Sequence, residues 1–586
     1  MRLRRRLSGW LAVATAGVLA LSGMAGLTSS AMAEEPAEQC SGAGIPPAEH
    51  VLGEGSSLQK VAQAIWDDEE SLTGKGFNNS EYVGACNGKQ GLHANKPVVL
   101  YNSTGSGAGR LAWGAEEPLN KPKDGKKMNP AESGDAFVGT DEPLSEAQLK
   151  NLDEAAGGKF KEAGKEQALV IPVEQAAVAV IVNMPANCDL TKITNGNLQK
   201  IWNGEITEWS GVTGGAAEEA GVTELVAGAC KVAIERVVRK DVSGTTFVFK
   251  TYLNEILKGE DTCAGAGPPL LSWAHYAEPE HNLEWPEELT SPPATCKGEV
   301  IVATENGGGG EVKEVKALTG TIGYANLADA RAGYTEEVGN NYHWLGVQNQ
   351  AEPNLYPFPG TSTGEPSKTT GESNCKGTHY TNLPTAPGPD DDWSKVNGAH
   401  PGTEATNKNA NYPICTLTYD VALVSYEEAG FAESNKIGTT AYNYLNYVVT
   451  PSEEGAGGQA DLAGHDYLEV EEAVGKFAQE EAELIAGGSR LDYSVGGAVI
   501  TLLLFSGPLP QVIDLMIKNL GPKVYLISLE DFGIFTPAGS GGVFETTQCE
   551  VDELGVNGEC LVNVTALKAG LAYLVDWLQI RLHLEA

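Results

Sequence analysis

Short apolar runs alternate with amphipathic segments between Val51 and about Arg331. In segment 57–69 the apolar residues share one face of a helix, and segment 243–257 repeats that spacing. The apolar runs have the length and composition of strands, and they lie at 98–101, 135–140, 168–173, 177–183 and 231–238. Strands that alternate with helices in this way predict an α/β fold.

The pattern changes in the second half of the chain. Residues of about 345–411 are rich in Pro, Gly, Thr, Asn and Ser, which indicates an inserted loop region, pinned in part by Cys375. Regular structure is expected to resume with a strand in 412–426, followed by helices at 440–450 and near 468–485.

The N-terminus reads as a targeting segment. The basic start "MRLRRR" precedes an apolar stretch and then "AMA" ending at Ala33, which predicts a cleaved signal peptide over 1–33; the alternative is an uncleaved anchor helix. Residues 34–50 read as a linker. The protein is therefore expected outside the cytoplasm, in a periplasm, at a cell surface or secreted.

The last hundred residues, 487–586, form a C-terminal extension whose role the sequence does not indicate. Segment 494–513 carries no charge, but Pro508 and Pro510 interrupt it, so a buried strand or helix of a small extra domain is favoured over a membrane anchor. Leucines at heptad-like spacing between Leu567 and Leu582 predict a helix that docks on this domain or on a partner.

Charge limits the partners of this chain. A length of 586 residues favours several domains, and the formal net charge is -38. Removal of residues 1–33 takes away four arginines and no acid, which lowers the charge to -42. Such a surface repels nucleic acid and acidic membranes at long range. Any anion that binds must therefore be held by local donors.

Ten cysteines, all after the expected signal peptide, fit an oxidising compartment. The chain has no CxxC pair and no histidines at metal-ligand spacing, so no metal or cofactor is expected. Proximity along the chain suggests a pairing that the sequence alone does not determine: Cys40–Cys86, Cys188–Cys230, Cys263–Cys296, Cys375–Cys415 and Cys549–Cys560.

Three segments place glycine and hydroxyl residues where a helix would begin: "GEGSSLQ" (53–59), "NSTGSGAG" (102–109) and "VSGTTF" (242–247). A helix start offers unpaired N–H groups and the positive end of a dipole, which suits an anion. Each segment alone is most simply an ordinary N-cap. Three of them in one α/β chain, together with Arg239-x-Asp241, indicate an anion site.

A fourth segment, "FVGTDEPL" (137–144), ends an apolar strand with Asp141. A carboxylate in an anion site is repulsive unless the ligand donates a proton to it. Hydrogen phosphate carries such a proton and sulfate does not, so Asp141 predicts discrimination between the two. Arg239 offers a planar, permanently charged fork for two oxygens of a tetrahedral anion, and Asp241 could hold that fork.

The order and spacing of these segments resemble the phosphate-binding proteins of phosphate ABC transporters, a family of extracytoplasmic solute-binding proteins. The resemblance covers roughly residues 50–486 apart from the insertion. Its most specific elements are "IWNGEITEW" and "RKDVSGTTF", and it extends to "FVGTDEPL", "IPVEQAAVAVIVN" and "TGTIGYANLADA".

The resemblance implies a two-lobed, type II-like binding-protein fold without catalysis, which closes on inorganic phosphate and presents it to a membrane permease. The protein would be a monomer. The expected divisions are lobe 1 in 51–171 and 323–486, and lobe 2 in 172–322. The family's ligand-binding positions correspond here to Ser57, Leu58 (through its N–H), Ser106, Asp141, Arg239, Ser243, Gly244 and Thr245, with Asp241 supporting Arg239.

The chain departs from the family at three of these places. Val242 replaces a usual glycine, Leu58 a common phenylalanine, and "GSGAG" a double-serine turn. Other functions also remain open: a binder of molybdate or sulfate, a phosphatase-like hydrolase with Ser106 or Ser243 as nucleophile, or a cell-surface interaction protein. No histidine lies near these serines in sequence, which argues against the hydrolase.

Overall fold

The computed structural model describes the chain in separate ranges. The chain divides into Met1–Glu35 and Pro36–Ala586, and all described residues belong to the second part. They are 50–67, 76–78, 82–83, 90–91, 98–115, 128–162, 165–188, 190–212, 229–257, 285, 299–336, 341–399, 411–451, 457–485, 489–495, 498–505, 511–519, 542–546 and 559–566. The expected signal peptide, nearly all of the linker and the leucine stripe at 567–582 lie outside the described residues.

The first half-sheet is built around a central parallel strand. In spatial order it contains β4 (Val98–Asn102), β1 (His50–Gly55), β5 (Asp135–Thr140), β13 (Cys415–Leu423) and the first part of β6 (Ala168–Asn183), with β14 (Tyr467–Leu468) also paired to β6. β1 is parallel to both β4 and β5, whereas β13 runs antiparallel to its neighbours. Parallel neighbours require crossover connections, which helices supply here.

The helices of this part are α2 (Lys60–Asp67), α3 (Ser106–Ala112), α4 (Pro130–Ser133), α5 (Glu146–Ala155), α12 (Ser434–Val449), α13 (Gly458–Asp461) and α14 (Glu472–Ala482). The helices expected at 57–69 and 468–485 are confirmed with shorter bounds. The helix expected at 440–450 begins earlier, at Ser434. A short hairpin, β2 (Tyr82–Val83) and β3 (Gln90–Gly91), lies between α2 and β4 in sequence.

The second half-sheet contains, in spatial order, the end of β6, β10 (Thr321–Asn326), β8 (Glu235–Val238) and β9 (Glu299–Val302), and β11 (Tyr342–Trp344) also pairs with β6. Its helical elements are α6 (Asn195–Trp202), η1 (Trp209–Gly211), α8 (Gly244–Leu257), α10 (Gly307–Ala317) and α11 (Leu327–Gly333). A separate pair joins β7 (Lys192–Ile193) to β12 (Gly346–Val347). The helix expected at 243–257 is confirmed as α8.

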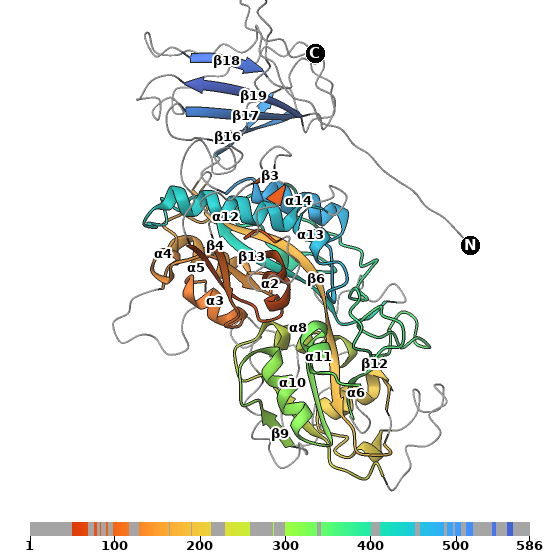
Figure 1. Ribbon diagram of the computed structural model, residues 1–586. Helices are drawn as coiled ribbons and strands as arrows, with labels where there is room; N and C mark the ends of the chain where they lie inside the picture. The colour runs from red at the N-terminus through yellow and green to blue at the C-terminus, as the bar shows by residue number, and fades with distance from the viewer. Residues whose placement is uncertain are drawn as a thin grey trace, which may run out of the picture. The chain divides into compact units, whose positions relative to one another are not determined.

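Strand β6 is one strand of 16 residues where the sequence pattern predicts two. Ala168–Ala177 pairs with β13, and residues 178–183 pair with β10, so β6 belongs to both half-sheets (Figure 1). The polar pair Glu174–Gln175 suggested a break, but Glu174 is fully buried and accepts a hydrogen bond from Thr418 at 3.2 Å. Pro172 is accommodated because the register shifts beside it, at Thr418/Tyr419.

This pairing bears on where the two halves divide. The chain changes partner between Ala177 and Val178, beyond the expected boundary at Pro172. The expected return near Gly323 falls inside β10, and β11 and β12 still pair with β6 and β7. The chain therefore reaches the first half-sheet again only after β12, through the segment 345–411.

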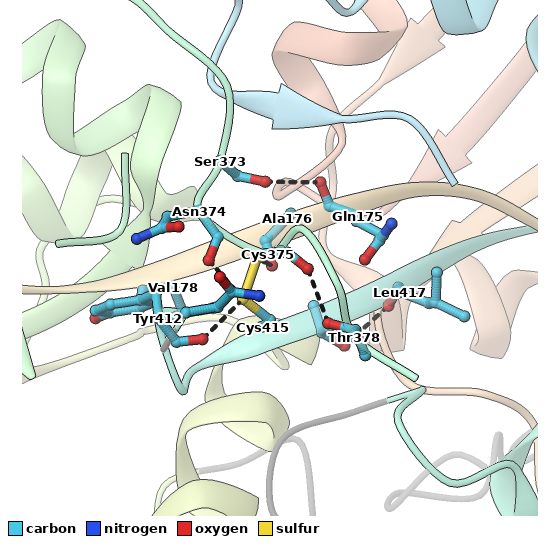
Figure 2. The surroundings of a disulfide bond; sticks show 12 residues. Gln175, Ala176, Val178, Ser373, Asn374, Cys375, Thr378, Tyr412, Cys415 and Leu417 are labelled. Atoms are coloured by element: carbon cyan, nitrogen blue, oxygen red, sulfur yellow. Dashed lines mark hydrogen bonds between the residues drawn. A yellow bond between two sulfur atoms is a disulfide. The ribbon is translucent and has the colours of Figure 1, made fainter. Parts of the chain in front are cut away.

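In its described part, segment 345–411 contains β12, η3 (Trp393–Lys395) and irregular chain. It is more than a surface loop, because Cys375 and Trp393 are fully buried. The predicted disulfide Cys375–Cys415 is present and joins the segment to β13. Figure 2 shows it beside Gln175, Ala176 and Val178 of β6. The disulfide thus lies where β6 passes between the half-sheets.

The predicted disulfide Cys188–Cys230 is also present. The other three suggested pairs involve cysteines outside the residues whose side chains the structure describes.

Aromatic packing fixes the helices behind the second half-sheet. Phe249 of α8 stacks on Tyr324 of β10 with ring centroids 4.6 Å apart, and Trp202 of α6 meets Phe249 edge-on at 4.9 Å. All three side chains are fully buried. Because such aromatic contacts are strong, they hold α8, and with it the start of that helix, against the sheet.

The C-terminal extension contains an antiparallel sheet in the order β15 (Ser489–Val495), β16 (Ala498–Phe505), β17 (Gln511–Asn519), β19 (Glu559–Ala566) and β18 (Gly542–Thr546). In the uncharged segment 494–513, the described residues 494–495, 498–505 and 511–513 belong to strands β15, β16 and β17. Among the described residues, no helix has the length and apolar character needed to cross a bilayer.

Candidate functional site

Three loops follow the carboxyl ends of the parallel strands β1, β4 and β5. In an open α/β sheet, ligands bind beyond the carboxyl ends, where the strand order reverses. The order reverses at β1, because β4 and β5 lie on its two sides. The predicted residues Ser57, Ser106 and Asp141 follow these strand ends, and all three are buried.

Arg239, which follows the carboxyl end of β8, reaches the first half-sheet. Its Nη2 donates to Ser57 Oγ at 2.7 Å, although 182 positions separate the two residues in sequence. Thr245, in the first turn of α8, donates from Oγ1 to Asp141 Oδ2 at 3.4 Å. These contacts bring the predicted residues of the two half-sheets together.

Two nitrogens of the Arg239 guanidinium, Nε and Nη2, have hydrogen-bond partners within the described part of the chain, and Nη1 does not. Its Nε donates to Asp241 Oδ1 at 3.0 Å and its Nη2 to Asp241 Oδ2 at 2.5 Å, while Oδ1 also accepts the N–H of Gly307 at 3.0 Å. Burial lowers the pKa of Arg239, but the charge of Asp241 acts in the opposite direction and outweighs it. The pKa of Arg239 therefore lies above its usual value. Nη1 is buried and has no hydrogen-bond partner among the described residues.

Asp141 lies 1% exposed at the end of β5. Its Oδ1 accepts a hydrogen bond from Ser56 Oγ, and its backbone N–H donates to Ser106 Oγ at 3.2 Å. Burial raises the pKa of Asp141 to about 6, although the hydrogen bond from Ser56 and the charge of Arg239 lower it. The carboxyl group is therefore mostly ionised at neutral pH and able to accept a proton donor.

Gly244 packs directly on this pair. A Cβ built on Gly244 would lie 2.5 Å from Ser106 Oγ and 2.6 Å from Asp141 Oδ2. Only a residue without a side chain permits such an approach. The first residue of α8 therefore lies against Ser106 and Asp141.

The start of α8 offers backbone donors at this point. Ser243 caps the helix, because its Oγ accepts the N–H of Thr246 at 3.3 Å. The N–H groups of Gly244 and Thr245 have no acceptor within the described ranges. With the positive end of the helix dipole, these groups suit an anion.

The backbone N–H of Leu58 is not free to donate to a ligand. Its N–H donates to Ser56 Oγ at 3.0 Å, and its side chain is fully buried. The structure thus brings Ser57, Ser106, Asp141, Arg239, Ser243, Gly244 and Thr245 to one place with Asp241 in support, and it shows the Leu58 N–H already engaged.

Three residues of this region were not predicted from the sequence. Ser56 contacts Asp141 directly, and its only signal was its position beside Ser57 in "GSS". Glu311 is buried and Asp329 is half-buried; desolvation raises the pKa values of both carboxyl groups, and the charge of Arg239 lowers them. Glu311 accepts the N–H of Tyr324 at 2.8 Å, and burial raises its pKa well above the usual range.

Within the ranges that the structure describes, no group of three or more histidine, cysteine, aspartate or glutamate side chains could hold a metal ion. The chemistry of the site is that of hydrogen-bond donors, one guanidinium and one carboxylate. This arrangement can hold an oxyanion.

Comparison with solved structures finds matches at low sequence identity and with TM-scores below 0.5. A phosphate-binding protein from Stenotrophomonas maltophilia is 17% identical, and the alignment covers 75% of this chain and 96% of that one at a TM-score of 0.44. PfluDING, a high-affinity periplasmic phosphate-binding protein bound with phosphate, is 16% identical with 73% and 92% covered and a TM-score of 0.43. A human phosphate-binding apolipoprotein is 16% identical with the same coverage and a TM-score of 0.41.

A sequence comparison with curated proteins finds no match. The family model described as a PBP superfamily domain matches residues 89–450, well over half of the chain. This match includes β4, β5, β6, β8, β10 and β13, and with them most of the site. The chain therefore belongs to the PBP superfamily and has its two-lobed α/β fold.

Proposed function

We propose that the protein binds inorganic phosphate, as hydrogen phosphate, in a cleft between the two half-sheets. Membership of a superfamily of binding proteins supports binding rather than catalysis. Ser57, Ser106, Arg239, Ser243, Gly244 and Thr245 are the proposed donors to the ligand, together with the N–H of Leu58 if that group changes partner.

The observation that carries this proposal is the unpaired Nη1 of Arg239. A buried guanidinium nitrogen without a partner is costly, because it has lost its hydration and gained no hydrogen bond. An oxyanion placed between Arg239 and the start of α8 would satisfy that nitrogen and the free N–H groups of Gly244 and Thr245. Asp241 would keep the fork oriented during binding.

Asp141 supplies the proposed selectivity. An ionised carboxylate would accept the proton of hydrogen phosphate, whereas it would repel sulfate, which has no proton to donate at neutral pH. Discrimination of several orders of magnitude is plausible for a site that leaves a buried polar group unpaired with the wrong ligand. The same argument disfavours molybdate.

A binding protein of this kind would deliver phosphate to an ABC importer in the membrane, without chemistry of its own. Donors from two lobes that contact one ion would favour a closed form, which a permease could recognise. The disulfides Cys188–Cys230 and Cys375–Cys415, with the expected signal peptide, support a location outside the cytoplasm. We propose a monomer.

Calorimetric titration of the mature protein with phosphate, sulfate and molybdate tests the proposal. Phosphate is expected to bind far more tightly than the other two, and Asp141→Asn is expected to reduce that preference. Sulfate binding as tight as phosphate binding in the wild type would overturn the selectivity. Hydrolysis of p-nitrophenyl phosphate that is lost in Ser106→Ala would instead favour an enzyme.

A further inference from the structure

Ser56 stands at the centre of the contacts around Asp141. Its Oγ accepts the N–H of Leu58 at 3.0 Å and the N–H of Gln59 at 3.3 Å, and so closes the turn that leads into α2. The same oxygen lies in hydrogen-bond contact with Asp141 Oδ1. Ser56 is fully buried, so no water competes for these positions.

These contacts determine where the hydroxyl proton points. A serine hydroxyl has two lone pairs and one proton. The two backbone N–H groups occupy the lone pairs, so the proton is left to donate to Asp141 Oδ1. In this arrangement Asp141 can only be the acceptor, and Oδ1 is not available to carry a proton of its own.

The other carboxylate oxygen has a different environment. Asp141 Oδ2 faces the start of α8, where a Cβ on Gly244 would lie 2.6 Å away, and Thr245 Oγ1 makes a long contact of 3.4 Å. Oδ2 therefore retains acceptor capacity on the side of the proposed ligand donors.

We propose that Ser56 is a positioning residue for phosphate binding: it occupies Oδ1 of Asp141 as a hydrogen-bond donor and so presents Oδ2, as an unprotonated acceptor, to the acidic hydrogen of the ligand. This inference rests on the proposed function. Ser56 would thus contribute to selectivity through Asp141, without contacting the ligand itself. The neighbouring Ser57 contacts Arg239 and not Asp141.

The electrostatic surroundings agree with this role. Among the influences that lower the pKa of Asp141, the hydrogen bond from Ser56 is the largest, followed by the charge of Arg239. Burial raises the pKa values of Glu174 and Tyr101 well above their usual range, and the charge of Asp141 raises both further. The hydrogen bond from Ser56 and the charge of Arg239 therefore both favour the ionised form of Asp141.

The test compares Ser56→Ala with Ser56→Thr, which retains a hydroxyl, by phosphate titration from pH 5.5 to 8.5. Loss of a hydrogen bond to a charged group corresponds to about 10- to 150-fold in affinity. We expect Ser56→Ala to weaken phosphate binding by about tenfold or more, with the larger loss at the acid end where Asp141 becomes protonated. Ser56→Thr is expected to restore most of the affinity.

Ser145→Ala is the matched control. Ser145 accepts the N–H of Gln148 at the start of α5, as Ser56 accepts backbone N–H groups in the turn before α2, but the structure gives it no hydrogen bond to Asp141. Its loss is expected to lower the melting temperature without changing phosphate affinity or its pH profile. An unchanged affinity and pH profile in Ser56→Ala, in a wild type that binds phosphate, would overturn the inference.

A second measurement keeps the inference testable if the wild type binds no phosphate. The carboxyl ¹³C signal of Asp141, assigned by its absence in Asp141→Asn, reports its titration in the ligand-free protein. Ser56→Ala is expected to move that titration to higher pH, and an unmoved titration would overturn the role of Ser56 even if phosphate binding itself had failed.

Discussion

Val242 of the second half-sheet packs on Gly107 of the first. A Cβ added to Gly107 would lie 2.2 Å from Val242 Cγ1, and the N–H of Gly107 donates to the carbonyl oxygen of Val242 at 3.2 Å. Val242 is the residue that departs from the glycine usual in the resembling family. The side chain of Val242 is accommodated because the residue that it contacts in the first turn of α3 is a glycine.

This contact predicts a reciprocal pair of variants. Gly107→Ala is expected to push α3 away from the segment that carries Val242. This should weaken phosphate binding, since overpacking costs about 1–3 kcal/mol. Val242→Gly in the same chain is expected to restore much of the affinity, because it removes the overlapping atoms. Calorimetric titration of both single variants and the double variant measures the coupling. Additive effects would show that the two side chains do not meet in the ligand-bound protein.

Arg239→Lys tests the need for a fork. Lysine keeps the charge but cannot contact Asp241, Ser57 and a ligand oxygen from one rigid plane. We expect phosphate affinity to fall by about 10- to 150-fold, the equivalent of one hydrogen bond to a charged group. Lys240→Ala is the control, because Lys240 is exposed and donates to the carbonyl oxygen of Thr304. Equal affinities of Arg239→Lys and the wild type would contradict the proposed role.

The ion pair between Arg110 of α3 and Glu142 supports the turn that carries Asp141. The two side chains are 0% and 8% exposed. Arg110→Met is expected to destabilise the protein by about 3–5 kcal/mol, because it removes the positive charge from a buried ion pair. Denaturant unfolding measures this loss.

The exposed pair Lys161–Glu146 provides the comparison for that prediction. Lys161→Met is expected to cost much less stability than Arg110→Met, because water screens the exposed pair. In the buried pair, the double variant Arg110→Met with Glu142→Gln is expected to be more stable than Arg110→Met alone. A double variant that is no more stable would show that Arg110 acts through packing rather than through its charge.

Asp390 predicts a pH dependence of stability. Both of its carboxylate oxygens are buried without a hydrogen-bond partner among the described residues. Burial, followed by the charges of Asp153, Glu166 and Asp391, raises its pKa from 3.8 to about 8. Between these two values the folded protein binds more protons than the unfolded chain does, so the free energy of unfolding falls as pH rises across this range.

Asp390→Asn is therefore expected to be more stable than the wild type at pH 8.5 and to lose less stability between pH 5 and 8.5. Melting temperatures of both proteins at the two pH values measure the effect, with Glu352→Gln as a control at an exposed position. Parallel curves for wild type and Asp390→Asn would exclude Asp390 as the titrating group.

The sequence pattern alone predicted the bounds of elements that have polar residues at both ends. The buried run "DAFVGT" has the same bounds in sequence and structure, because polar residues precede it and Asp141 follows it. The two strands expected around Glu174 fused into β6 because Thr418, on a strand far away in sequence, supplies the hydrogen bond that makes a buried glutamate tolerable. A single sequence carries no mark of that partner.

The candidate site shows the same limit. Glycine, hydroxyl and arginine residues could be selected from their motifs, but the contact between Arg239 and Ser57 depends on tertiary packing. Ser56 was missed because two adjacent serines are equivalent in a motif, and only the geometry shows that one faces Arg239 and the other Asp141.

Because β6 supplies ladder hydrogen bonds to β13 with one part and to β10 with the other, neither lobe has a complete sheet without the other. Melting of one lobe would leave part of the same strand with unpaired backbone groups, which penalises any partly melted species. The two lobes are thus linked in folding as well as in the binding that we propose, and damage in either one is expected to lower the cooperative stability of both.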